Sequence, residues 1–168
     1  AMSYLGSILT QSVRQGKEID TSNPFAGRKI PDYSNCKGVK RRQEVLIDRE
    51  EVVVISDFAH HPTAIAHTVK AAINHFPSQK ILGIIELASN TMSQGHHGAE
   101  LYESSSGLEK VFWLNLSGKR NQEFEYDSIK LLLTDLKKDI VNFDVILIMS
   151  NKDSKKISEP IIDLIKDK

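Results

Sequence analysis

One short segment of the chain concentrates side chains that can take part in chemistry. It reads Ser-Asp-Phe-Ala-His-His-Pro-Thr over residues 56–63 and places a carboxylate and two imidazoles in front of an expected helix. Because the free N–H groups at a helix N-terminus favour anions, the segment is a candidate nucleotide or carboxylate site. A structural alternative stays open, in which Asp57 accepts local hydrogen bonds while His60 and His61 are surface polar groups.

Other reactive patterns are sparse. A second histidine pair, His96 and His97, lies between two glycines. The six histidines have no cysteine beside them and no His-x-x-x-His spacing, so we expect no metal site. The sequence contains no G-x-x-x-x-G-K-[ST] loop, no G-x-G-x-x-G and no G-x-S-x-G. We therefore expect that the chain hydrolyses no nucleotide by itself.

The elements that must position these side chains form an α/β pattern. Expected strands cover residues 44–47, 51–56, 81–85, 111–116 and 144–149, and expected helices cover 62–76, 98–106, 126–138 and a last segment capped by Ser158. The first two strands predict an N-terminal β-hairpin. The alternation that follows predicts a Rossmann-like, mainly parallel sheet flanked by helices. Ligands bind outside the carboxyl ends of such strands, which singles out residues 57–63, 86–95 and 150–156.

The N-terminal part of the chain differs in composition. Residues 1–36 have few apolar anchors and several turn signals, among them Asn23-Pro24 and Pro31-Asp32. They predict a linker or loosely ordered arm, followed by one domain over residues 37–168.

Composition narrows the functional class. The 168 residues carry 22 Lys and Arg against 22 Asp and Glu, so zero net charge argues against a polybasic nucleic-acid module. No apolar run approaches the ~20 residues of a membrane span. The single cysteine, Cys36, and the lack of a signal-peptide pattern predict a cytoplasmic protein. One short basic cluster, Lys37, Lys40, Arg41 and Arg42, either meets a phosphate or is solvated.

Four segments in order resemble the C-terminal domain of the Mur ligases. They are Lys-Arg-Arg-Gln-Glu at 40–44, Asp-Phe-Ala-His-His-Pro-Thr-Ala-Ile at 57–65, Glu-Leu-Ala-Ser-Asn-Thr-Met at 86–92, and Ile-Leu-Ile-Met-Ser-Asn at 146–151. The second and third together are typical of the murein peptide ligase branch. The resemblance covers roughly residues 37–168.

The resemblance implies ATP-dependent amide formation by a longer enzyme. Its branch joins UDP-N-acetylmuramate to L-Ala-γ-D-Glu-meso-diaminopimelate in peptidoglycan recycling. The family binds the UDP-sugar in an N-terminal domain and ATP with Mg²⁺ in a central domain, and the C-terminal domain brings in the peptide. We expect those two domains to be missing here, so the chain alone is inactive and holds no cofactor of its own.

The resemblance also implies roles for individual residues. A nucleotide and hinge group consists of Arg42 near the phosphates, Asp57 by the ribose, and His60 and His61 at the closed interface. A peptide-binding group consists of Ser89, Asn90, Thr91, Ser150 and Asn151.

The sequence departs from the family pattern at three places. Leu87-Ala88 stand where the family has Pro-Arg, which removes a candidate arginine clamp for a substrate carboxylate. Lysine-rich residues 152–156 replace a glycine-rich loop, and residues 113–127 are shorter than in the family. Two main readings follow: the peptide-binding domain of a ligase, or a stand-alone degenerate Mur-like binding module without ligase activity. A generic α/β domain with a fortuitous motif is a third.

Overall fold

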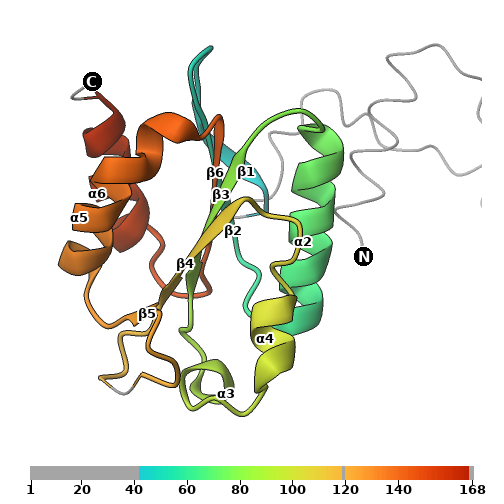
Figure 1. Ribbon diagram of the computed structural model, residues 1–168, viewed down its shortest axis with the longest axis vertical. Coiled ribbons are helices and arrows are strands. Elements are labelled where there is room, and N and C mark those ends of the chain that lie inside the picture. Colours follow the sequence, from blue (N-terminus) through green and yellow to red (C-terminus); the bar gives the residue numbers. More distant parts are fainter. Residues whose placement is uncertain (1–41, 119, 167–168) are drawn as a thin grey trace, which may run out of the picture. The chain divides into compact units, whose positions relative to one another are not determined.

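The computed structural model describes residues 42–118 and 120–166. The chain divides between Arg42 and Gln43, and the unit that begins at Gln43 contains one six-stranded sheet (Figure 1). Its strands are β1 (Glu44–Asp48), β2 (Val53–Asp57), β3 (Ile81–Glu86), β4 (Lys110–Leu114), β5 (Glu125–Tyr126) and β6 (Val145–Met149). The arm predicted over residues 1–36 lies outside the described residues, so that boundary stays a prediction.

The strand order is β1-β2-β6-β3-β4-β5. Strand β1 pairs with β2 in antiparallel fashion, through a turn in which the Arg49 amide donates to the Val52 carbonyl at 3.1 Å. The other four pairings are parallel. This arrangement confirms the predicted α/β fold with a mainly parallel sheet and an N-terminal hairpin.

Helices cover both faces of the sheet. They are α2 (Pro62–His75), α3 (Asn90–Ser93), α4 (Ala99–Glu103), α5 (Ile129–Asp139) with a 3-10 turn η1 (Ile140–Asn142), and α6 (Lys155–Lys166). Helices α2 and α4 lie on one face, and α5 and α6 lie on the other (Figure 1). Within the described residues, none of these helices has the length and apolar character needed to cross a membrane.

The central strands are buried because both of their faces are covered. Every residue of β3 and β6 is buried, as expected for continuous apolar runs in a parallel sheet. Alternate side chains enter two separate cores: Ile84 packs in the core that includes residues of α5 and α6, and Ile85 in the core under α2 and α4. Helix α2 adds a stripe of Ile65, Val69 and Ala72 behind Pro62 at its start.

Two predicted boundaries in the C-terminal half are wrong. Tyr126 does not begin a helix but ends the edge strand β5, because its carbonyl accepts a 2.7 Å hydrogen bond from the Asn115 amide. Ser158 does not cap α6 but lies inside it, since its amide already donates to the Ser154 carbonyl at 2.8 Å. The expected helix over 98–106 is also shorter, at Ala99–Glu103.

Candidate functional site

The carboxyl ends of three neighbouring strands meet at one edge of the sheet. Asp57, at the end of β2, is in register with Met149 of β6, which is in register with Ile85 of β3. The Ser150 amide donates to the Asp57 carbonyl at 3.0 Å, and the Ser150 hydroxyl donates to Oε2 of Glu86. The edge therefore brings together the three polar segments that the sequence singled out, 57–63, 86–95 and 150–156.

The Asp57 carboxylate is buried, with 4% of the residue exposed, and contacts three donors. Its Oδ1 accepts from the Ala59 amide at 2.7 Å and from the Thr68 hydroxyl at 3.3 Å, while Oδ2 accepts from the Gln43 amide at 3.0 Å. Gln43 has a φ of 50°, in the left-handed region that costs a non-glycine residue energy. Asp57 thus joins the start of the domain to β2 and α2 through one local and two longer-range hydrogen bonds. Each oxygen keeps lone-pair capacity for another donor.

The two histidines after Asp57 have different surroundings. His60 has Nδ1 3.0 Å from the Phe58 carbonyl, and its ring meets the Phe58 ring edge-on. His61 is exposed and lies edge-on against His97, with 4.9 Å between ring centroids. This pairing of His61 with His97 was not predicted from the sequence. Among the described residues, no three His, Cys, Asp or Glu side chains gather as a metal site requires.

The Ser-Asn-Thr-Met segment forms the short helix α3 after β3. Ser89 precedes it and caps it, since its hydroxyl accepts from the Met92 amide at 3.4 Å and lies 3.3 Å from the Thr91 hydroxyl. Met92 is fully buried in the core under α2 and α4. Asn90 and Thr91 are exposed, so this anchored turn presents two polar side chains to solvent.

Two predicted site residues, Ser150 and Asn151, follow β6 and differ in burial. Ser150 is fully buried, and its hydroxyl also accepts from the Lys152 amide at 3.1 Å. Asn151 is half-buried, and its Oδ1 is a buried atom without a hydrogen-bond partner in the described part of the chain. Arg42 is exposed and lies on the other side of the chain division, before Gln43.

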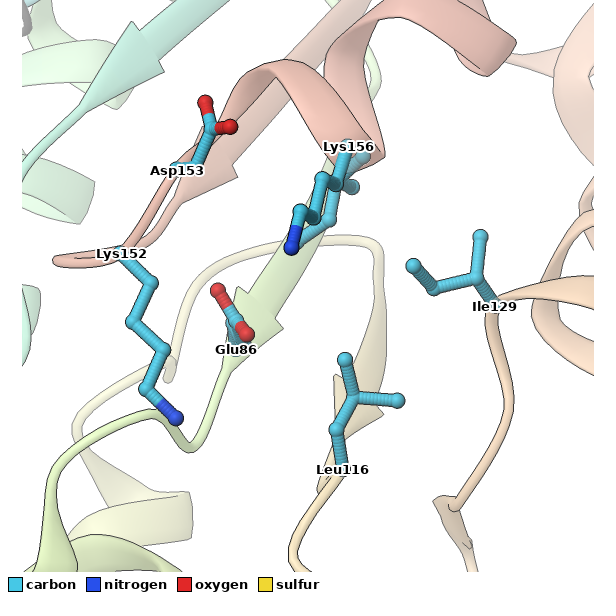
Figure 2. Close-up of a pocket in the computed structure, with 7 residues that line it drawn as sticks. Glu86, Leu116, Ile129, Lys152, Asp153 and Lys156 are labelled. Carbon is cyan, nitrogen blue, oxygen red and sulfur yellow. The ribbon is translucent and has the colours of Figure 1, made fainter.

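A cavity of about 180 Å³ opens beside this edge (Figure 2). It is lined by Glu86, Leu116, Ile129, Lys152, Asp153, Lys156 and Ile157. In Figure 2 the amino group of Lys156 is directed toward the Glu86 carboxylate, the side chain of Lys152 extends past it, and Asp153 points away. None of the predicted site residues lines this cavity. The sequence signal that marks it is Glu86, a charged residue at the end of an otherwise apolar strand.

Two relatives of this chain are ligases that act on UDP-N-acetylmuramate. The UDP-N-acetylmuramate–L-alanine ligase of Cytophaga hutchinsonii is 30% identical over 142 residues, 74% of this chain and 30% of that protein. The UDP-N-acetylmuramate–L-alanyl-gamma-D-glutamyl-meso-2,6-diaminoheptandioate ligase of Haemophilus influenzae is 37% identical over 76 residues, 45% of this chain and 17% of that protein. The crystal structure of the murein peptide ligase from Psychrobacter arcticus superposes with a TM-score of 0.63 at 26% identity, over 78% of this chain and 31% of that one. The chain belongs to the Mur ligase family.

Coverage indicates which part of a Mur ligase this is. The chain spans less than a third of the two relatives, 30% and 17% of their lengths. A crystal structure of a domain from a candidate UDP-N-acetylmuramate:L-alanyl-gamma-D-glutamyl-meso-diaminopimelate ligase of Haemophilus ducreyi is also similar. The match covers 98% of that domain and 75% of this chain, with a TM-score of 0.56 and 26% identity. This partial coverage fits a Mur ligase C-terminal domain. No family model matches the chain.

Proposed function

We propose that this Mur ligase domain binds the amino substrate of an enzyme that joins UDP-N-acetylmuramate to L-Ala-γ-D-Glu-meso-diaminopimelate in peptidoglycan recycling. The observation that carries the proposal is the shared edge, where the Ser150 amide donates to the Asp57 carbonyl at 3.0 Å. It aligns the Asp-Phe-Ala-His-His-Pro-Thr segment with the Ser-Asn that follows β6. The activity of the Haemophilus influenzae relative supports the choice of substrate.

Within this proposal the edge has two functional halves. Asp57, His60 and His61 face the nucleotide across the hinge, and Arg42, which precedes the sheet domain in the chain, is assigned to the nucleotide phosphates by resemblance alone. Ser89, Asn90, Thr91, Ser150 and Asn151 hold the peptide, with the exposed Asn90 and Thr91 making direct contacts and the buried Ser150 positioning the edge.

ATP and Mg²⁺ belong to the rest of the enzyme in this account. The sequence has no phosphate-binding loop of the G-x-x-x-x-G-K-[ST] kind, and the described residues contain no three-ligand metal cluster. We therefore assign no catalytic step to this domain. Its contribution is to bring the amine to the acyl phosphate and to exclude water when the enzyme closes, which can lower a barrier by several kcal/mol.

A second function is favoured by one observation. Leu87 and Ala88, which replace the family's Pro-Arg, are buried, with 2% and 8% of each residue exposed. The edge thus has an apolar filler where the family has an arginine. In the alternative, the chain is a stand-alone binding module that has lost ligation.

Two experiments test the proposal. In isothermal titration the 168-residue chain is expected to bind the tripeptide saturably and L-alanine undetectably, and to hydrolyse no ATP. If the chain bound L-alanine and did not bind the tripeptide, its amino substrate would instead match that of the Cytophaga hutchinsonii relative. If it bound neither compound, the proposal would be overturned. The coding sequence upstream of Ala1 separates the two functions, because the ligase reading requires it to continue into a G-x-x-x-x-G-K-[ST] loop.

A further inference from the structure

We propose that Glu125 is a positioning residue, which holds the short helix α3 in the place where Asn90 and Thr91 meet the peptide. It acts through two asparagines that lie between it and the helix. The inference rests on the proposed function and adds to it a residue that does not itself touch the ligand. Glu125 lies on the edge strand β5, which β4 separates from β3.

Glu125 is a buried carboxylate that receives three hydrogen bonds. Only 2% of the residue is exposed, and its pairing with β4 places it in register with Trp113. Its Oε1 accepts from the Tyr102 hydroxyl at 2.5 Å, and its Oε2 accepts from the Asn115 side-chain amide and the Asn121 backbone amide, both at 2.9 Å. Burying a carboxylate is costly unless hydrogen bonds compensate it, and bonds to a charged acceptor are among the strongest. Glu125 therefore fixes groups from α4, from the end of β4 and from the loop before β5.

Tyr102 is a lasting donor in this network. Burial, followed by its hydrogen bond to Glu125 and the charge of that carboxylate, raises the pKa of Tyr102 far above its ordinary value. Its ring lies edge-on to Trp113 and to Phe124, with 5.0 Å between ring centroids in both pairs. The hydroxyl is therefore protonated at neutral pH and held in place by its neighbours, so it anchors Glu125 to α4.

The two asparagines extend this anchoring to α3. The Ser93 carbonyl, in the last turn of the helix, accepts from the side-chain amide of Asn115 at 3.2 Å and from that of Asn121 at 3.0 Å. The same Asn121 amide also lies 3.4 Å from the Met92 carbonyl. Carbonyls at the end of a helix lack partners within the helix, so the asparagines satisfy groups that the helix itself leaves open.

Gly95 leaves room for Asn121 beside the helix. A Cβ at this position would lie 3.1 Å from Cγ and from Oδ1 of Asn121, closer than ordinary van der Waals contact. The glycine also has a φ of 75°, which side chains of other residues rarely allow. The loop that follows α3 is thus shaped to admit the asparagine.

Helix α3 needs such support because it has only four residues. A helix of this length does not form by itself in water, and its Ser89 cap is a long contact of 3.4 Å. Its exposed Asn90 and Thr91 follow the carboxyl end of β3, where ligands of parallel sheets bind. A buried polar network whose members are satisfied fixes one arrangement of the elements it joins. The Glu125 network therefore sets where these two side chains stand.

The test measures tripeptide binding by isothermal titration to the whole chain and its variants. Glu125→Met keeps the length of the side chain and removes both acceptor oxygens. Glu125→Gln keeps one oxygen for the two asparagines and can donate to the Tyr102 oxygen, so it is the conservative rescue. We expect Glu125→Met to weaken binding about tenfold and Glu125→Gln to stay within about threefold of the native chain.

Three further variants separate positioning from packing and from overall stability. Glu123→Met makes the same change at a nearby exposed glutamate, and Leu136→Val weakens the core on the α5 face of the sheet. Both should bind the tripeptide as the native chain does. Asn121→Ala is a milder variant, because it removes the side-chain bonds to α3 and keeps the backbone bond to Glu125. It should weaken tripeptide binding several-fold.

Amide hydrogen exchange reports on α3 directly. The amides of Ser93 and Gln94 make the backbone hydrogen bonds that close its turn. In Glu125→Met we expect the exchange of these two amides to accelerate about tenfold more than that of Leu147 in β6. In Leu136→Val the amide of Leu147 should accelerate at least as much as they do.

Each contrary result has a different meaning. If Glu125→Met binds the tripeptide as tightly as the native chain, the positioning role is overturned and the proposed function stands. If Glu125→Met and Leu136→Val weaken binding equally, and exchange accelerates alike in α3 and β6, the role is also overturned, because only overall stability was lost. If the native chain binds no tripeptide, the proposed function is contradicted and the positioning role falls with it.

Discussion

The hydroxyl of Ser150 donates a hydrogen bond to the carboxylate of Glu86, and this contact joins the ends of two adjacent parallel strands. Both residues are buried, so the bond forms away from competing water. It fixes one wall of the cavity and, through the backbone of the same serine, the end of β2.

Removing this hydroxyl should destabilise the domain. Ser150→Ala leaves a buried carboxylate oxygen without its donor, which typically costs about 1–3 kcal/mol of unfolding free energy. Urea denaturation measures the change. Ser106→Ala, at an exposed serine in a turn, is the control and should stay within about 0.5 kcal/mol of the native chain. Equal stabilities for the two variants would contradict a structural role for the contact.

The Asp57 carboxylate should matter more than any one of its donors. Asp57→Ala removes the acceptor of three hydrogen bonds, two of them from backbone amides, and should cost at least about 2–3 kcal/mol. Thr68→Val removes only the 3.3 Å bond and should cost about 1 kcal/mol or less. Urea midpoints for both variants check the order. A Thr68→Val variant as unstable as Asp57→Ala would be inconsistent with the network described.

Tyr126 should ionise at unusually high pH. Burial, followed by its hydrogen bond to Asp135, raises the pKa of Tyr126 to about 12. Since the folded pKa lies above the unfolded value near 10, the stabilisation is fully present below pH ~10 and is lost as the pH rises through about 12. The difference in tyrosinate absorbance between the native chain and Tyr126→Phe isolates this group. A midpoint near 10 in that difference would contradict both the burial of Tyr126 and its hydrogen bond to Asp135.

Restoring the family's arginine should strengthen peptide binding. Ala88→Arg adds a guanidinium that can hold a carboxylate in bidentate fashion, so we expect the tripeptide to bind about tenfold more tightly. Gln94→Arg adds the same charge at an exposed position on the same loop and is the control. Tight binding that Ala88→Arg leaves unchanged would refute the role given to the missing arginine. Thermal unfolding accompanies the titration because Ala88 is buried.

Much of the fold follows directly from the sequence. The continuous apolar runs of β2, β3 and β6 predict buried parallel strands, and Pro62 with its stripe of apolar residues predicts α2. Strand β5 could not be predicted in this way, because its two residues are held by the Asn115 amide rather than by their own periodicity. Ser158 resembles a helix cap in sequence, but α6 begins at Lys155, and the amides of Ile157 and Ser158 already donate to the Ser154 carbonyl.

The candidate site was predictable only in part. That Asp57 and Ser150 share an edge follows from the rule for parallel sheets, since both follow strands. The cavity could not be foreseen, because it depends on how α5 and α6 pack around the end of β3. Lysines 152 and 156 are four residues apart, and only the turn into α6 brings both to the Glu86 cavity.

The central claim is that the carboxyl edge of the sheet binds the peptide. Titration of the isotopically labelled chain with the tripeptide, followed by amide chemical shifts, tests it most directly. We predict the largest shifts at Ser89–Thr91 and at Asn151 and Lys152. Shifts confined to Arg49 and Glu50, at the turn on the opposite edge, or no shifts at all, would contradict it.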